Sequence, residues 1–374
     1  MHLTQTMQAT SSVLKLYAEN IGKTELSQDI PEELQRYVRQ MRFAPLGSDG
    51  QQQLAHSRIL ICGCGALGSV LANTLARAGV ASLRIVDRDF LEWNNLQRQV
   101  LYTEQDVKSG IPKAIAAKAH LEKINSEIEV EAVVANVSAE NIGELVDSVD
   151  CIVDGTDNFE TRFLLNDAAV KHNIPWIYGG CIGSEGQTMT ILPGETPCLH
   201  CLMQGGPPPP GTTPTCDSAG ILSPVINVIA SIQALEAIKI ISGNRDKISR
   251  DLQIFDLWEN QIRQVKLSQL LENGDCKTCH QKQFDWLTGK RGSQSAILCG
   301  RNAVQLSFSG ETHIDLESMQ DKLSVLGTVD SNPFLLRASI EQFEITVFAD
   351  GRAIIKGTED ETVARSVYAK YIGN

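Results

Sequence analysis

Apolar runs that end in glycine or aspartate alternate with helix-period segments in the first half of the chain. The run ILIC ends at Gly63, and apolar residues then recur with helical spacing as far as Val80. Strand patterns follow at 82–87, 128–136, 150–158, 175–180 and 186–194, and helix patterns follow at 140–146 and 159–172. This alternation predicts an α/β fold with a Rossmann-like, mixed but mostly parallel sheet and helices on both faces.

The start of the chain differs from this pattern. Residues 1–28 are expected to form a loose N-terminal extension. DIPEELQRYVRQMRF, residues 29–43, predicts a helix that Asp29 caps, with Pro31 in its first turn. The main domain is therefore expected over 29–285, and a polar linker over 286–299.

Residues 300–374 predict a small α+β domain. Its expected elements are a strand at 302–310, a helix at 315–326, strand segments at 333–343 and 344–357 with Asp350 and Gly351 at a hairpin tip, and a closing helix at 359–372. The position of this domain suggests a partner-binding or ubiquitin-like adaptor module. A packing lid that stabilises a dimer is the alternative.

Composition and charge narrow the classes of function. The chain has 374 residues, of which 42% are hydrophobic, and its net charge of -12 argues against a broad nucleic-acid or anionic-membrane surface. We expect no apolar segment of membrane-spanning length and see no secretory or transit pattern, so the expected location is the cytoplasm. Ten cysteines without an export signal favour thiols, metal ligation or catalysis over a disulfide scaffold.

A nucleotide site is expected where the first apolar run ends. Gly63, Gly65 and Gly68 form a tight turn into a helix, whose N-terminal N–H groups favour a phosphate. Asp87 ends the next strand about 20 residues later, where a carboxylate can bind ribose hydroxyls. A nicotinamide-dependent oxidoreductase fits this turn equally well, and a tight packing turn between strand and helix, without a nucleotide, is the structural alternative.

Three polar features at the ends of elements extend this site. NNLQRQ places Asn95 and Arg98 where phosphates would lie, and Lys113 stands in the first turn of a helix that Pro112 opens. A cation beside free N–H groups is better explained by a polyphosphate than by its own helix, although a solvated lysine remains an alternative. In DGTDN, Asp154 and Asp157 could serve magnesium or simply form a turn.

Two C-x-x-C pairs predict a metal site. CLHC contains Cys198 and Cys201, CKTC contains Cys276 and Cys279, and four thiolates suit tetrahedral zinc. Such a structural zinc would clip the later part of the chain onto the core. The alternatives are haem attachment at CKTCH and a thioredoxin-like dithiol, which the missing export signal and the local patterns disfavour.

A further cysteine is a candidate nucleophile. Residues 205–214 are rich in glycine and proline, which predicts an extended loop that delivers Cys216 to the start of an apolar helix. A thiol near a helix N-terminus has a lowered pKa and is more nucleophilic. An exposed bystander thiol is the alternative.

These motifs together carry a family resemblance. The chain resembles the ThiF/MoeB/HesA family, bacterial relatives of ubiquitin-activating enzyme, in ICGCGALGSVLANTLARAGV, IVDRDFLEWNNLQRQ, IPKAIAAK, DGTDN, CLHC, TCDSAGILSPVINVIASIQALEAIK and CKTC, between Pro31 and Gln283. Members use ATP and magnesium to adenylate the C-terminal glycine of a ubiquitin-like sulfur carrier of ThiS or MoaD type, releasing pyrophosphate. The acyl-adenylate becomes a thiocarboxylate in thiamin, molybdopterin or thionucleoside synthesis.

The resemblance implies a role for each matching residue. It assigns the glycines to the nucleotide turn, Asp87 to the ribose, and Asp157 to the neighbourhood of magnesium and the reacting carboxylate. It assigns the phosphates to Asn95, Arg98 and Lys113. Arg39 resembles the arginine that family dimers lend to the partner's ATP.

The resemblance also implies partners. They are a carrier with a C-terminal diglycine, a sulfur donor of cysteine desulfurase or rhodanese type, and a second copy in a homodimer, without nucleic acid or membrane. Cys216 matches a cysteine that bonds the carrier in some relatives and is dispensable in others. Ala66 departs from a second glycine that is usual there. An NAD-dependent oxidoreductase and a non-catalytic carrier-binding scaffold remain alternative functions.

Overall fold

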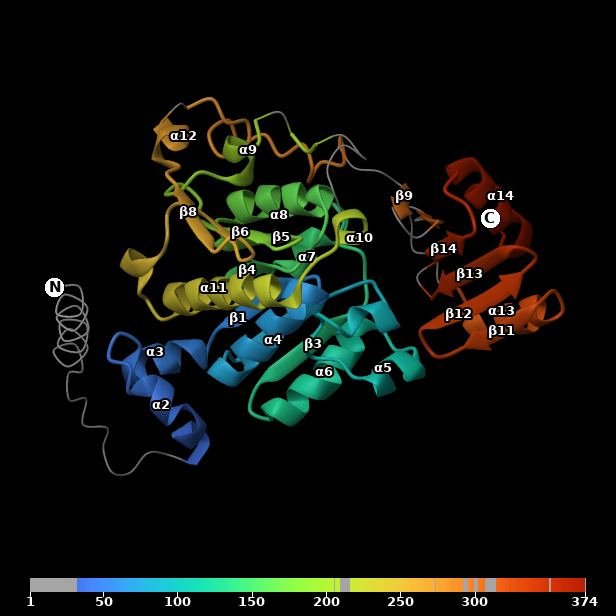
Figure 1. Ribbon diagram of the computed structural model, residues 1–374, viewed down its shortest axis with the longest axis horizontal. Coiled ribbons are helices and arrows are strands. Elements are labelled where there is room, and N and C mark those ends of the chain that lie inside the picture. Colours follow the sequence, from blue (N-terminus) through green and yellow to red (C-terminus); the bar gives the residue numbers. More distant parts are fainter. Residues whose placement is uncertain are drawn as a thin grey trace.

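The computed structural model describes residues 32–204, 206–208, 216–272, 274–291, 295–298, 302–306, 314–349 and 351–373. The expected extension at 1–28, the cap Asp29 and Pro31 lie outside these residues, as does most of the 205–214 loop. Two sheets organise the described chain, and Figure 1 shows the second sheet (orange to red) at one end of the first, far from the N-terminal helices (blue).

The larger sheet has eight strands in the order β3-β2-β1-β4-β5-β6-β7-β8. They are β1 (Arg58–Cys62), β2 (Ser82–Val86), β3 (Glu129–Val133), β4 (Cys151–Asp154), β5 (Trp176–Ile182), β6 (Glu185–Ile191), β7 (Leu252–Asp256) and β8 (Gln261–Val265). The first five strands of this order are parallel, and the last three are added antiparallel. The mixed, mostly parallel Rossmann-like sheet is therefore confirmed.

Helices cover both faces of this sheet. One face packs against α4 (Ala66–Ala78), α6 (Lys113–Ile124) and α11 (Ser223–Ile241), and the other against α7 (Ile142–Leu145) and α8 (Phe159–His172) (Figure 1). The strand β1 shows why, because Ile59 and Ile61 belong to one buried cluster and Leu60 and Cys62 to the other. Strands buried on both faces read as continuous apolar runs, as ILIC does.

The helix α11 corrects the expectation that no apolar segment is long enough to span a membrane. It has 19 residues and a mean hydropathy of 1.5, so by length and composition it could cross a membrane. Half of its apolar window is buried, and Ile226, Ile229 and Ala230 pack in the core cluster that lies between this helix and the sheet. Its apolar character thus follows from packing on a sheet within a folded domain.

The remaining elements of this part of the chain are short. They are η1 (Glu32–Tyr37), α2 (Val38–Met41), α3 (Gly47–Leu54), η2 (Trp93–Asn95), α5 (Glu104–Ser109), α9 (Leu199–Leu202), α10 (Cys216–Ala219), η3 (Arg245–Lys247) and α12 (Ser268–Glu272). The helix expected over 29–43 is thus a 3-10 turn followed by one α-helical turn. Tyr37 interrupts it with φ of -102° and ψ of 1°, and its ring is buried.

The smaller sheet is antiparallel, in the order β11-β12-β13-β14-β10-β9. Its strands are β9 (Ser295–Leu298), β10 (Ala303–Leu306), β11 (Thr328–Ser331), β12 (Leu335–Ile340), β13 (Phe343–Phe348) and β14 (Ala353–Lys356), and its helices are α13 (Leu316–Ser324) and α14 (Glu361–Tyr371). The expected linker over 286–299 needs correction at both ends. Trp286 is buried in the core of the larger unit, and β9 pairs with β10.

Candidate functional site

Three glycines interlock where the order of the larger sheet reverses, between β1 and β4. Gly63 follows β1 with φ of +82°, and a Cβ on it would lie 2.7 Å from the carbonyl oxygen of Gly155, which follows β4. A Cβ on Gly68 would lie 1.9 Å from the Gly63 oxygen. Ligands of such sheets bind outside the carboxyl ends of the strands at this reversal. The sequence singled out Gly63 and Gly68 but missed Gly155, although it stands in the quoted DGTDN.

Gly65 differs from these glycines, because it faces open space. It caps the N-terminus of α4, and the atom nearest to an added Cβ would be Nε2 of Gln99, at 3.7 Å. The Gln99 side chain is 3% exposed, and its Oε1 has no hydrogen-bond partner among the described residues. The turn therefore leaves room beside a helix N-terminus, which suits a phosphate group. The buried Gln99 oxygen instead needs a donor, such as a hydroxyl of a ligand.

Asp87 joins the glycine turn to the end of β2. Its Oδ2 accepts the N–H of Cys64 at 2.6 Å, and its Oδ1 accepts the N–H of Asp89 at 2.7 Å. Burial raises the pKa of this carboxyl, although the Lys113 charge and these two hydrogen bonds oppose the rise. Each oxygen keeps a second lone pair, so ribose hydroxyls can still bind there.

Lys113 is buried at the first position of α6 and pairs with Asp89. Its Nζ lies 3.3 Å from Asp89 Oδ2, and its N–H donates to the Asp89 carbonyl at 2.9 Å. Burial would lower the pKa of Lys113, but the carboxylates of Asp89, Asp87 and Asp157 together raise it. The lysine is therefore charged and lies among three carboxylates. Its position at the helix N-terminus is compensated by Asp89, which the sequence did not single out.

Asn95 and Arg98 lie on the loop after β2. Asn95 is 2% exposed, its Oδ1 accepts the N–H of Glu92 at 3.1 Å, and its Nδ2 donates to Oδ1 of Asn94 at 2.8 Å. Arg98 is half-buried, and its guanidinium donates to the Asn94 carbonyl at 2.8 Å. These bonds order the loop and leave further Arg98 donors for a ligand.

The two aspartates of DGTDN have different surroundings. Asp154 is fully buried, and its Oδ2 lies 3.2 Å from Nε of Arg162. Burial raises the pKa of Asp154, and the Arg162 charge opposes this rise. Asp157 is exposed, and its charge raises the pKa of both Lys113 and Arg162. Only Asp157 of this pair is open to solvent, while Asp154 holds the turn in place.

Arg39 lies far from the Lys113 end of its own chain. Its neighbour Tyr37 accepts a hydrogen bond from Asn125 at the C-terminal cap of α6, at 2.8 Å. The helix α6 has 12 residues, so its two ends are about 18 Å apart. The exposed Arg39 side chain is thus at the opposite end of α6 from the nucleotide turn.

The segment that carries Cys216 is anchored at the carboxyl end of β5. The helix α10 begins at Cys216, and after it Leu222 donates its N–H to the Gly183 carbonyl at 2.9 Å. The N–H of Gly183 in turn donates to Gly220, also at 2.9 Å. The helix therefore starts near the sheet edge that carries the glycine turn, while the Cys216 side chain lies outside the described part of the structure.

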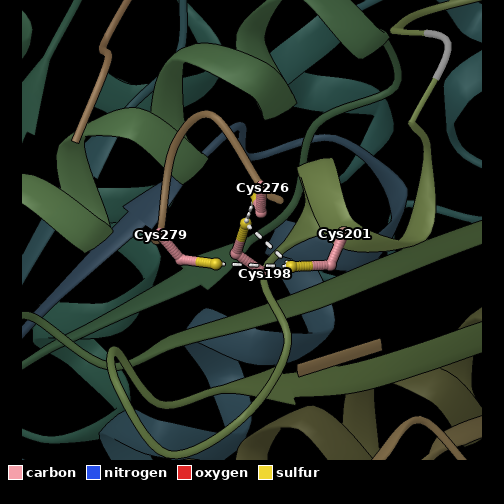
Figure 2. Close-up of side chains that lie close together, drawn as sticks. All are labelled: Cys198, Cys201, Cys276 and Cys279. Atoms are coloured by element: carbon pink, nitrogen blue, oxygen red, sulfur yellow. Dashed lines mark hydrogen bonds between the residues drawn. The ribbon is translucent and has the colours of Figure 1, made fainter. Parts of the chain in front are cut away.

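The four expected metal ligands come together (Figure 2). The Sγ atoms of Cys198 and Cys201 lie 3.8 Å apart, those of Cys198 and Cys276 3.6 Å, and those of Cys201 and Cys279 3.3 Å. Four sulfurs around zinc at tetrahedral bond lengths lie about 3.8 Å from one another. Hydrogen bonds from Cys198 and Cys201 lower the pKa of Cys279 to about 7, which favours its thiolate. The donor set fits zinc.

Side chains of α8 hold both halves of this cluster. Asn166 accepts the N–H of Leu199 at 2.8 Å. Asp167 accepts from the Thr278 hydroxyl at 3.2 Å and from the N–H of Trp286 at 3.0 Å. Both C-x-x-C pairs are thus held by one core helix. This position is typical of a metal site that stabilises the fold. In the part of the chain that the structure describes, it is the one cluster placed to hold a metal.

Comparisons with known proteins agree with this geometry. The chain is 46% identical to the sulfur carrier protein ThiS adenylyltransferase of Bacillus subtilis (strain 168), over 90% of this chain and 99% of that relative. It is 37% identical to the sulfur carrier protein adenylyltransferase of Thermus thermophilus, over 66% of this chain and 91% of that relative.

Solved structures share the fold. The crystal structure of E. coli MccB with succinimide matches 69% of this chain and 78% of its own, at 26% identity and a TM-score of 0.56. The profile of the ThiF family matches residues 37–278, which include the glycine turn, Lys113 and all but one of the clustered cysteines. The chain therefore belongs to the ThiF family.

Proposed function

We propose that the protein adenylates the C-terminal glycine of a small ubiquitin-like sulfur carrier of ThiS or MoaD type, using ATP and releasing pyrophosphate. The observation that carries this proposal is a buried, charged lysine among the carboxylates of Asp89, Asp87 and Asp157, in a chain that is 46% identical to an adenylyltransferase. The thiocarboxylate made from the acyl-adenylate would serve thiamin, molybdopterin or thionucleoside synthesis.

The chemistry requires cations more than a base. A C-terminal carboxylate is ionised near neutral pH, so it attacks the α-phosphorus without losing a proton. Two anions approach each other in this step, and Lys113 and Arg98 would neutralise the developing charge. Gly63, Gly65 and Gly68 would admit the phosphates, and Asp87 would hold the ribose. When the phosphates bind, they would take over part of the interaction that Lys113 makes with Asp89 in the free protein.

Magnesium would bind at the open side of this site. Asp157 is an exposed carboxylate whose charge acts on Lys113 and Arg162. Magnesium prefers oxygen ligands, so this carboxylate and the phosphate oxygens suit it. Asn95 would act through the loop that it orders, next to Arg98. Held there by Asp157, the ion would neutralise part of the phosphate charge.

A homodimer would complete each site. Arg39 is too far along α6 to reach Lys113 of its own chain, so its contribution to ATP would come from the partner copy. A sulfur donor of cysteine desulfurase or rhodanese type would deliver sulfur to the activated carrier. Cys216 would receive the acyl group or take part in that transfer, and we expect the enzyme to work in the cytoplasm.

ATP–pyrophosphate exchange tests the proposal. Purified ThiS-like and MoaD-like carriers would be compared, each with and without the terminal glycine. Exchange that requires both magnesium and the glycine is the expected result. A protein that binds ATP and zinc yet supports no exchange with any carrier would instead be a scaffold. Reduction of a nicotinamide cofactor would favour the oxidoreductase alternative.

A further inference from the structure

The C-terminal unit contacts the larger unit at two places next to the proposed nucleotide site. The ring of Phe348 in β13 lies 5.3 Å from that of Phe90, at an interplanar angle of 31°. Nδ2 of Asn332, just after β11, donates to the carbonyl of Gly110 at 2.8 Å. The unit is therefore docked on the loops that follow β2 and α5.

Phe348 is buried by this docking and does not belong to the core of its own unit. Along β13, Phe343, Ile345 and Val347 face the C-terminal core, whereas Phe348 points to the opposite face of the sheet. It is nevertheless only 3% exposed, with the guanidinium of Arg352 at 4.6 Å from its ring. An aromatic side chain on this face is explained by its contact with Phe90.

Asn332 satisfies a helix end in the other unit. Its Oδ1 accepts the N–H groups of Phe334 and Leu335, at 2.9 and 3.1 Å, which fixes the side chain on its own turn. Its Nδ2 is then directed at Gly110, the left-handed residue that ends α5 with φ of +60°. The terminal carbonyl groups of a helix need such donors from outside.

Both contacts lie beside the Asp89 and Lys113 pair. Phe90 directly follows Asp89, and it forms an isolated antiparallel bridge with Pro112, which directly precedes Lys113. Gly110 stands at the start of the same short segment. The C-terminal unit thus contacts both chain segments that carry this ion pair.

We propose that Phe348 and Asn332 are positioning residues of the nucleotide site, through which the C-terminal unit holds the Asp89 and Lys113 segments in the arrangement that accepts phosphates. Nucleotide binds only to the competent arrangement, so its apparent Kd rises as the population of that arrangement falls. The inference rests on the proposed function for the identity of the ligand, ATP. The proposal gives the C-terminal unit a role in ATP binding, and thus in the adenylation step that precedes sulfur transfer.

The test uses the full-length protein with Phe348→Leu and Asn332→Ala. Loss of an aromatic contact or of one hydrogen bond is expected to raise the Kd for ATP about fivefold, measured by calorimetry. The KM for the carrier should stay unchanged. Amide hydrogen exchange of residues 110–116 should become faster, because the N–H of Lys113 is protected by the Asp89 carbonyl.

Phe343→Leu is the matched control. Phe343 lies on the same strand but faces the C-terminal core, so this variant weakens the unit without removing the docking contact. Its Kd for ATP and its exchange at 110–116 should equal those of the wild type. The inference is overturned if Phe348→Leu and Asn332→Ala behave like Phe343→Leu in both measurements. The amide measurement needs no ligand, so it also decides the matter if the wild type fails to activate any carrier.

Discussion

Nζ of Lys113 lies 3.3 Å from Oδ2 of Asp89, and both groups belong to short segments joined by the Phe90 and Pro112 bridge. The ion pair keeps the lysine charged in a buried position before any phosphate arrives. A group held in this way has lost its side-chain freedom in advance, so less entropy is lost when the ligand binds.

Replacing this lysine should abolish most of the activity. We expect Lys113→Met to lower the rate of ATP–pyrophosphate exchange about 100-fold, because one charge-stabilising contact in the transition state is lost. Lys118→Met is the control, since Lys118 lies on the same helix, its side chain is 44% exposed, and it pairs with Glu122 at 3.7 Å. Equal rates in the two variants would remove Lys113 from the site.

The glycines should separate folding from binding. Gly68→Ala places a Cβ 1.9 Å from a carbonyl oxygen and should cost about 3 kcal/mol of the free energy of unfolding. Gly65→Ala meets no atom closer than 3.7 Å, so it should lower the melting temperature less and weaken ATP binding, because the methyl group occupies the ligand's space. Thermal unfolding and calorimetry of both variants provide the comparison. Full ATP affinity in Gly65→Ala would place the phosphates elsewhere.

The buried Asp154 and Arg162 pair should be structural and pH-dependent. Arg162→Met leaves Asp154 buried without a counter-charge and should cost about 3–5 kcal/mol at pH 7.5. Burial already raises the pKa of Asp154, and loss of the arginine raises it further, so the folded variant binds a proton more readily than the unfolded chain. Its deficit relative to the wild type should therefore shrink as the pH falls toward 5.5. Urea unfolding at both pH values measures this, and a constant deficit would contradict it.

Metal removal should destabilise the fold. Purified protein should contain one zinc per chain, and Cys276→Ser or a chelator should lower the melting temperature by about 10 °C, since structural zinc contributes several kcal/mol. Cys181→Ser, outside the cluster, should keep the zinc content of the wild type. Metal analysis of all three samples decides the point, and an unchanged zinc content in Cys276→Ser would rule out the proposed site.

A mixing experiment tests the dimer. Arg39→Ala and Lys113→Met homodimers should each be nearly inactive, because every site lacks one residue. After the two variants are mixed and their subunits redistribute, half of the dimers are heterodimers, and each has one intact site of two. ATP–pyrophosphate exchange should therefore recover to about a quarter of the wild-type rate. No recovery after proven subunit exchange would place Arg39 and Lys113 in the same site of one chain, or leave Arg39 without a role.

The sequence predicted the parts of the structure that rest on local patterns. The C-x-x-C spacing and the glycine turn are such patterns, and the cysteines do converge. The Asp89 partner of Lys113 was missed, because it lies 24 residues away and only tertiary folding brings the two together. The strand β8 was also missed, since it is exposed along its length and lacks a buried face to create alternation.

The boundary of the C-terminal unit was misplaced for a related reason. The polar composition around residue 290 indicated a linker, yet an edge strand such as β9 needs only backbone pairing to join a sheet. Trp286 was assigned to the same linker but stacks on Phe163 at 5.5 Å. The average composition of a segment does not reveal a single buried residue, such as Trp286, that anchors it to the core.

The cysteine cluster also sets an order of events during synthesis. Cys198 and Cys276 are separated by 78 residues, and β7, β8 and α11 lie between them. The ribosome therefore releases the first pair of thiols well before the second pair exists, and during this interval they can bind the wrong metal or become oxidised. A site that needs all four thiols cannot form until the second pair has been made, so we expect the metal to bind late in folding.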